Sequence, residues 1–481
     1  MRPNRGAVRP LTGALIGGGD VSATERVVSF VVETDGKAIP DEAREYGRRA
    51  LLDTVGVTLA GVDEPSAALS RRMVRSEGGE GQATIIGSPY RVPLAAAALA
   101  NGTAGHALDY DDVTASMTGH PSIPLAPAVL GVGEVEGSSG YDVVSAFVIG
   151  FEAECKIGRG LGRSHYARGF HQTTTLGALG SAAASARLMH LDHEQTAHAL
   201  GIASSMAGGL RANFGSMTKP LQAGNAARGG VVAALLAREG FTGGDNILDG
   251  PIGFINAFSP AGDADMEAVD GFGDQWEVIS PGISVKKYPC CFVTHRPADA
   301  TLTLVEQHSL TPEMVDHIEV HVPSGAISAT GHVGPLIHSR PQTGLEGKFS
   351  LEYVVAASLF DRELKFATFE DGAVQRPELQ AFLPKVTAVP DAEGHPAADS
   401  LGGGVNIVEI HTTDGRVLTE AVQEARGGPA SPLSWDELLG KYHDCATRTL
   451  DDDAAQRSAE LMVDLDGVEN VRELTATLST A

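Results

Sequence analysis

The N-terminal half of the chain shows the hydrophobic pattern of packed helices. Ala-rich segments alternate with Gly, and β-branched residues rarely alternate with polar ones. Residues 41–61 begin with acidic side chains, carry apolar residues at helical spacing and end at a glycine, which predicts one long helix. Residues 173–210 predict two helices separated at 190–193. Small residues recur in both helices, so these helices can approach their neighbours closely.

The pattern changes in the second half of the chain. Residues 314–325 alternate apolar and polar side chains, which predicts a strand. Residues 405–422 hold two alternating runs around an Asp414-Gly415 turn, which predicts a hairpin. Between them, residues 347–361 predict an amphipathic helix. This part of the chain therefore predicts a mixed α+β unit.

Helical spacing returns over residues 435–467, after a linker rich in Gly, Pro and Ser. The pattern predicts a mainly α protein, in which both chain ends form a large all-helical domain and a smaller α+β domain is inserted. A cleft between two such units is a usual place for a small-molecule site. The expected division is a disordered extension over 1–21, the helical domain over 22–280 and 429–481, and the α+β domain over 281–428.

Charge and cysteine content narrow the classes of function. The 481 residues carry a formal net charge of −25, which argues against nucleic acid or an anionic membrane as a partner, because both need a basic surface. An anionic substrate would need a locally basic pocket. No apolar run resembles a signal peptide or a membrane span. The four cysteines have no metal-site spacing and indicate a reduced, cytoplasmic protein: Cys155, Cys290, Cys291 and Cys445.

Polar side chains gather beside Gly or Pro in five stretches, as they do in loops that hold functional groups on a rigid scaffold. These stretches are residues 106–122, 167–180, 208–230, 284–295 and 339–350.

The first stretch carries three aspartates and a histidine. Asp109 lies between apolar neighbours, which favours an inward side chain. Asp111 and Asp112 fit either a solvated acidic face or an active site. His120 precedes a proline, so its backbone is extended or in a turn. A lone histidine is usually structural, but the neighbouring acids favour a functional role here.

The other stretches supply a histidine and several lysines. Helix capping explains the threonines that follow His171 but not the imidazole itself. Lys219 precedes a proline among small residues, so it cannot lie in a helix interior and needs an anionic partner, either an acidic side chain or a substrate carboxylate. Lys286 and Lys287 precede a Tyr-Pro pair in the same manner. Such lysines would give an acidic protein its basic pocket.

Five blocks of this chain resemble, in order and spacing, those of the MmgE/PrpD family, which includes 2-methylcitrate dehydratase, cis-aconitate decarboxylase and iminodisuccinate epimerase. The resemblance runs from about residue 25 to 470 and implies a helical domain with an inserted α+β lid, usually as a homodimer. The five blocks are NGTAGHALDYDD, GFHQTTTLGALGSAAA, MTKPLQAGNAARGG, KKYPCCFVTH and LEGKFSLEYVVAASL.

The resemblance also implies a set of site residues. It assigns catalytic roles to Asp109, His120, His171 and Lys219, and substrate-binding roles to Lys286, Arg211, Cys291 and again Lys219. The two histidines are the acid and base candidates, in an order that the sequence leaves open, and Asp109 is their orienting or proton-sharing partner. Cys291 stands where the decarboxylase branch has a histidine, and Gln222 stands where many members also have a histidine.

Members of the family act on di- and tricarboxylates without a metal or organic cofactor. The resemblance therefore favours a lyase that dehydrates or hydrates a hydroxy di- or tricarboxylate through proton transfer beside a carboxylate. Lysines would stabilise the charge that develops on the carboxylate oxygens. Because Cys291 replaces a histidine, decarboxylation of cis-aconitate is less favoured, and epimerisation of an amino or imino dicarboxylate is the next alternative.

Two alternatives come from other classes of protein. Residues 109–112 match the DxDD motif of helical terpene cyclases, but those pockets need aromatic walls, and aromatic residues form only 5% of this chain. A helical binding protein that has lost its activity is the second alternative, and the intact lysines and histidines argue against it.

Overall fold

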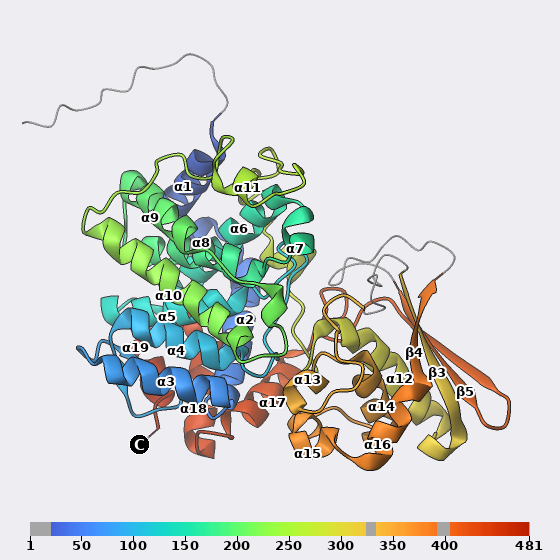
Figure 1. Cartoon of the computed structure of the whole chain (residues 1–481). Coiled ribbons are helices and arrows are strands. Elements are labelled where there is room, and N and C mark those ends of the chain that lie inside the picture. The colour runs from blue at the N-terminus through green and yellow to red at the C-terminus, as the bar shows by residue number, and fades with distance from the viewer. Residues whose placement is uncertain (1–20, 324–332, 392–404, 481) are drawn as a thin grey trace, which may run out of the picture.

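The computed structural model describes residues 21–323, 333–391 and 405–480. It shows a large helical body joined to a smaller α+β unit (Figure 1). The expected mainly α class is confirmed. The expected disordered extension over 1–21 lies, except for its last residue, outside the described residues.

The helical body is built from both ends of the described chain, and its long helices begin and end close to the predicted positions. Residues 41–61 form one helix, and the two helices of residues 173–210 are separated at 189–192. Its helices are α1 (Ala23–Glu33), α2 (Asp41–Gly61), α3 (Pro65–Glu77), α4 (Leu94–His106), α5 (Ser122–Glu136), α6 (Gly140–Leu161), α7 (Ser164–Arg168), α8 (Gln172–Leu188), α9 (His193–Met206), α10 (Thr218–Arg238), α11 (Phe254–Ala257), α17 (Trp435–Ala446), α18 (Asp452–Val463) and α19 (Arg472–Thr477), and a two-stranded ribbon of β1 (Ala83–Thr84) and β2 (Arg91–Val92) lies beside them.

Small residues let α4 and α10 pack with their backbones almost in contact. A Cβ atom on Gly102 would lie 2.7 Å from the Cα atom of Gly224, a distance that real Cβ contacts do not reach. One turn beyond Gly102, α4 ends at His106, and five residues before Gly224 the first turn of α10 carries Lys219. The close helix crossing therefore brings these two polar side chains together.

The smaller unit is a four-stranded sheet with helices on one face (Figure 1). The strand order is β4-β3-β5-β6, in which β3 runs parallel to β4 and antiparallel to β5. The predicted hairpin is present as β5 and β6, with Gly415 in the left-handed region at the turn. The elements of this unit are α12 (His295–His308), β3 (Val315–Pro323), α13 (Gly344–Gly347), α14 (Leu351–Asp361), α15 (Asp371–Val374), α16 (Pro377–Phe382), β4 (Val386–Asp391), β5 (Asn406–Thr412) and β6 (Val417–Val422).

The helix predicted over 347–361 differs from the observed α14 in two ways. It begins four residues later, because the Ser350 side chain accepts a hydrogen bond from the Tyr353 backbone N–H and caps the helix there. It is also buried along most of its length instead of being amphipathic. The reason is its position in the centre of the unit, between α12 and the elements around β4.

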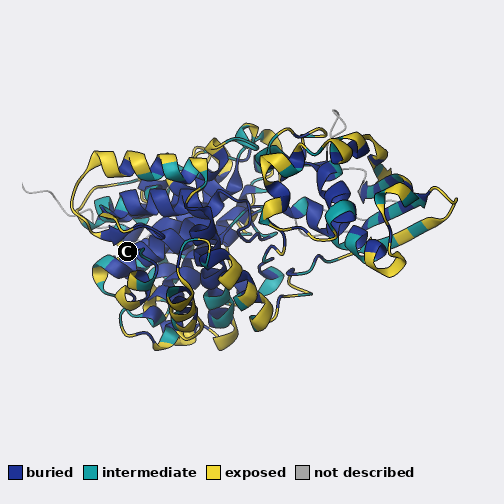
Figure 2. Cartoon of the chain, turned by 90° about the horizontal axis from the view of Figure 1, so that it is seen from below, coloured by how far each residue is buried: buried dark blue, intermediate teal, exposed yellow. Residues whose placement is uncertain are grey.

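Each of the two parts has its own hydrophobic core. One core joins buried residues from the segments 23–283 and 433–478, and the second joins buried residues between 288 and 410. Figure 2 shows both as dark blue interiors under a more exposed surface. Side chains at the junction between the two parts are therefore held from both sides.

A buried lysine of α17 ties the junction together. The Lys441 Nζ atom lies 2.7 Å from Asp53 Oδ1 on α2, and both side chains are almost fully buried. The same ammonium donates hydrogen bonds to the backbone carbonyl oxygens of Tyr110 and Lys286, at 3.1 Å and 2.8 Å. Lys441 thus fixes the chain after α4 against the chain that enters the smaller unit.

We expect Lys441→Ala to destabilise the protein by about 3–5 kcal/mol, because it leaves Asp53 buried without its cation. Burial already raises the pKa of Asp53, and Lys441 opposes that shift. Without the lysine the acid needs a proton to remain buried, so the loss should grow as pH rises from about 4 to 8. Urea unfolding at several pH values measures the effect.

Two variants control this experiment. Lys37→Ala removes an exposed lysine and should change the unfolding midpoint little. The double variant Asp53→Asn/Lys441→Met removes both charges and should recover most of the loss. A Lys441→Ala protein as stable as Lys37→Ala would show that the buried pair does not hold the junction.

Candidate active site

A small cavity lies where the helical body meets the smaller unit. Its volume is about 30 Å³, which is room for about two water molecules. The helical body contributes Asp109, Val113, Thr118, Gly119, His120, Tyr166, His171, Thr173, Phe214 and Lys219, and the smaller unit and the segment that leads to it contribute Lys286, Cys291, Phe292, Val293, Pro335 and Phe349.

Asp109 lies between two lysine ammonium groups at one side of the cavity. It follows the end of α4 in the left-handed backbone region, which aspartate tolerates better than most residues. Lys219 Nζ donates to Asp109 Oδ1 at 2.5 Å, and Lys286 Nζ donates to Oδ2 at 2.9 Å and to the backbone carbonyl at 2.6 Å. Burial opposes ionisation, but the two lysines hold the pKa of Asp109 below its usual range. Asp109 is therefore an anion that orients two cations.

His106 completes this group, although the sequence analysis did not single it out. Its Nδ1 atom lies 2.8 Å from Asp111 Oδ2, and its Nε2 atom accepts a hydrogen bond from Lys219 Nζ at 2.8 Å. Because an ammonium can only donate, Nε2 is unprotonated and Nδ1 carries the proton. Burial lowers the pKa of His106. The only signal in the sequence was its place in the same block as the aspartates.

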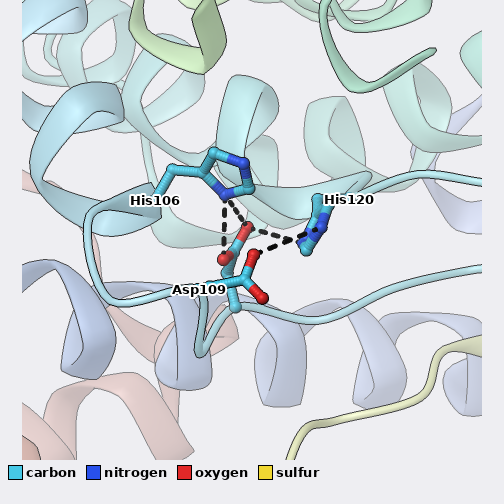
Figure 3. A group of neighbouring side chains, drawn as sticks. His106, Asp109 and His120 are labelled. Carbon is cyan, nitrogen blue, oxygen red and sulfur yellow. Dashed lines mark hydrogen bonds and ion pairs between the residues drawn. The ribbon is translucent and has the colours of Figure 1, made fainter. Parts of the chain in front are cut away.

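Asp111 is fully buried, which corrects the reading of this residue as part of a solvated face. Despite burial, its contacts with His106 and His120 hold its pKa well below the usual range. The His120 Nδ1 atom lies 3.1 Å from Asp111 Oδ2, and its Nε2 atom lies 3.8 Å from Asp109 Oδ1. Figure 3 shows His106, Asp109 and His120 turned toward one another.

Asp112 is also fully buried, so the solvated reading is wrong for it too. Its carboxyl accepts hydrogen bonds from the Ser122 backbone N–H at 3.3 Å and from the Ser122 hydroxyl at 2.5 Å, at the start of α5. Burial raises the pKa of Asp112 to about 8. Asp112 holds α5 in place, whereas Asp109 faces the cavity.

His171 faces the cavity from the start of α8 with one nitrogen free. Gln222 donates from Nε2 to the Leu210 carbonyl at 3.1 Å, so its Oε1 atom must be the one that faces His171 Nδ1, at 2.7 Å. Nδ1 therefore carries the proton, and the Nε2 lone pair is unprotonated and has no hydrogen-bond partner among the described residues. Burial and Lys219 lower the pKa of His171 well below its ordinary value.

Both cavity histidines are thus neutral at neutral pH. Burial lowers the pKa of His120 to about 4, with Asp111 opposing the shift and the two lysines supporting it. A neutral imidazole with an open Nε2 atom is a proton acceptor. The cavity therefore presents a base opposite two ammonium groups.

The remaining candidates have different positions. Cys291 lines the cavity, and burial raises the pKa of its thiol to about 11, so the thiol keeps its proton at neutral pH. Lys287 is exposed, and its Nζ atom lies over the Tyr288 ring. Arg211 is not one of the residues that line this cavity in the described chain; its guanidinium lies 3.7 Å from the Tyr166 ring centre and donates to the Tyr166 carbonyl.

Four side chains at this end of the cavity could bind a metal ion, because one potential ligand atom of each lies within 4.8 Å of the others: His106, Asp109, Asp111 and His120. Two ammonium groups already bind these side chains, since Lys219 contacts His106 and Asp109, and Lys286 contacts Asp109. A metal ion would have to displace these cations. The donor set fits a lysine-bound acid–base site better than a metal site.

The family comparisons agree with this architecture. The model of the MmgE/PrpD N-terminal domain matches residues 25–267, and that of the MmgE/PrpD C-terminal domain matches residues 288–466. The chain belongs to the MmgE/PrpD family. Within the described residues, no helix is both long and apolar enough to cross a membrane.

Curated relatives cover nearly the whole chain. A cis-aconitate decarboxylase of Mus musculus is 29% identical over 473 residues, which cover 95% of this chain and 93% of the relative. A cis-aconitate decarboxylase of Aspergillus terreus is 28% identical over 463 residues, 92% of each chain. The one from Homo sapiens is 27% identical over 459 residues, 92% of this chain and 91% of the relative.

We expect Gln222 to control the tautomer and the pKa of His171. Gln222→Glu places a negative charge beside Nδ1, so the pKa of His171 should rise toward or above the ordinary value of about 6.5. Gln222→Met keeps the volume but removes the acceptor, so both tautomers should be populated. A pH titration of ¹⁵N-labelled histidines by NMR measures both effects.

The wild-type protein provides the reference: His171 should remain neutral below pH 6 with the proton on Nδ1. The NMR signals of the exposed His443 should be the same in all three proteins at each pH, which controls for unrelated changes. An unchanged His171 signal in Gln222→Glu would show that the amide does not set its protonation.

Proposed function

We propose that this protein is a cofactor-independent lyase that removes water from, or adds it to, a hydroxy di- or tricarboxylate resembling 2-methylcitrate. The observation that carries the proposal is the neutral His171, a residue of the cavity wall whose unprotonated Nε2 atom is buried and has no hydrogen-bond partner among the described residues. A base of this kind suits removal of a proton from carbon. The lysines opposite suit the negative charge that this step creates.

The lysines have donors left for a substrate. An ammonium has three N–H donors. Lys219 donates to His106 Nε2 and Asp109 Oδ1, and Lys286 donates twice to Asp109, so one N–H of each remains beyond these described contacts. Both lysines line the cavity, and we propose that these remaining donors bind a substrate carboxylate.

The proposed elimination follows from these positions. His171 Nε2 takes the proton from the carbon beside a carboxylate, and the electron pair moves onto the carboxylate oxygens, which Lys219 and Lys286 stabilise. The pair then forms the carbon–carbon double bond as the hydroxyl group leaves. The His171 imidazolium formed in the first step, or the protonated Cys291, gives the leaving hydroxyl group a proton and converts it to water. Hydration is the reverse of these steps.

The make-up of the cavity wall allows a conformational step. Lining residues come from both parts of the chain. We propose that a movement of the smaller unit away from the helical body opens the cavity to the substrate. This motion would make the smaller unit the lid that the family resemblance implies.

Decarboxylation of cis-aconitate is the second candidate, and the names of the relatives favour it. That reaction needs a proton delivered to carbon as CO₂ leaves. Both cavity histidines are neutral and Cys291 holds its proton tightly, so the best proton donor is a weaker acid than an imidazolium. Epimerisation of an amino or imino dicarboxylate would use the same proton removal without loss of a hydroxyl.

Product analysis separates these reactions. The EDTA-dialysed protein should convert 2-methylcitrate or citrate to the unsaturated acid. In D₂O, hydration of the unsaturated acid should place deuterium on the carbon next to the one that receives the hydroxyl group. ¹H NMR follows both changes, and EDTA should not slow them, because the proposed steps use side chains only. Efficient formation of itaconate from cis-aconitate would establish the decarboxylase instead.

Lys219 at the cavity and Lys287 at the surface provide a matched pair of variants. Lys219→Ala removes one of the two cations that face the developing charge and should lower kcat/KM by about 10²–10³-fold or more. Lys287→Ala should leave kcat/KM close to the wild-type value, because Lys287 is exposed. Circular dichroism and thermal unfolding verify that both variants are folded. Equal losses at the two positions would argue for a solvated basic patch in place of a catalytic lysine.

A further inference from the structure

The outer face of the sheet in the smaller unit carries a cluster of histidine and glutamate side chains. On β3, His317, Glu319 and His321 alternate with residues that point into the core, and on β5 the same holds for Glu409 and His411. The antiparallel register places His317 opposite His411 and Glu319 opposite Glu409. The helices α12 and α14 cover the other face of this sheet, away from the cluster (Figure 1).

Linear spacing cannot reveal this cluster, because β3 and β5 lie far apart in the sequence. The spacing of the four cysteines, which gave no sign of a metal site, has no bearing on these histidines and glutamates. Strand pairing assembles the side chains from two distant segments, and the cluster is separate from the residues that line the cavity.

The nitrogen and oxygen atoms lie at the separations of ligands around one ion. His317 Nε2 is 3.9 Å from Glu319 Oε1, and His411 Nε2 is 3.7 Å from Glu409 Oε2. These distances are too long for hydrogen bonds. A tetrahedral zinc ion with bonds of about 2.1 Å spaces its ligand atoms about 3.4 Å apart. The His317 and His411 rings are stacked with their centroids 4.1 Å apart, so binding by both imidazoles needs these rings to rotate until their Nε2 lone pairs meet at the ion.

Two further observations indicate a cation between these side chains. The Nε2 atoms of His321 and His411 are enclosed by protein and have no hydrogen-bond partner among the described residues. His317 Nδ1 lies 2.9 Å from Asp316 Oδ2, which leaves its Nε2 atom directed to the cluster. Metal-binding histidines commonly have a carboxylate on the nitrogen that does not bind the metal.

We propose that His317, Glu319 and His411 bind one divalent transition-metal ion of the zinc class, with Glu409 or His321 beside it as a further ligand. The ligand atoms of His317, Glu319 and His411 lie within 4.8 Å of one another. Two imidazoles and a carboxylate favour Zn²⁺, Ni²⁺ or Cu²⁺ over Mg²⁺, which prefers oxygen ligands. The bound ion links β3 to β5 and stabilises the sheet, independently of the proposed reaction.

Zinc titration of the full-length, EDTA-dialysed protein tests the site. Isothermal titration calorimetry with ZnCl₂ should give one tight ion per chain, and MgCl₂ should give no comparable binding. His317→Ala, His411→Ala and Glu319→Gln should each weaken zinc binding by at least about 10–100-fold. The exposed histidines of other surfaces provide matched controls, so His308→Ala and His443→Ala should bind zinc as the wild type does.

Thermal unfolding gives a second readout, because an ion that binds only the folded state raises Tm. Zinc should raise Tm of the wild type and of the control variants but not of His317→Ala/His411→Ala, whose circular dichroism without zinc should match the wild type. Failure of the wild type to bind zinc at micromolar concentration, or equal binding by the double variant, would overturn the proposal. Turnover of the double variant without zinc should remain at the wild-type level, which separates this test from the proposed activity.

Discussion

The pairing of one buried carboxylate with two ammonium groups is the interaction on which the candidate site depends. Asp109 binds Lys219 from the helical body and Lys286 from the segment that enters the smaller unit. Neither lysine could remain charged at this depth without an anion. The aspartate therefore lets an acidic protein hold two cations at a cavity wall, and it connects the two parts of the chain at the point where the lining residues meet.

The composition of the helices serves the same arrangement. The contact between Gly102 and Gly224 lets α4 and α10 approach until His106 and Lys219 form a hydrogen bond. Larger side chains at the crossing would separate the helices. The Lys219 ammonium and the His106 imidazole would then stay buried without the hydrogen bond between them. Ala- and Gly-rich sequence, which by itself indicates only close packing, thus also sets the geometry of charged groups.

The local sequence pattern predicted the helices and strands, whereas the roles of the polar residues depend on burial by distant parts of the chain. The helix over 41–61 and the hairpin at Asp414-Gly415 follow from short-range spacing, so the sequence sufficed for them. From the sequence alone, Asp111 and Asp112 fit a solvated surface as well as a buried site, because their burial depends on elements far away in the chain. Similarly, nothing near Gln222 in the sequence shows that its amide faces His171, since that contact joins α8 to α10.

The position of Lys441 has a consequence for the order in which the protein is made. Its ammonium donates hydrogen bonds to the carbonyl oxygens of Tyr110 and Lys286, yet it lies on α17, far beyond both residues in the sequence. All the side chains assigned to the cavity chemistry leave the ribosome long before this helix does. The growing chain therefore contains every reacting group before it has the contact that fixes their backbone, so the site becomes complete only after α17 has been made.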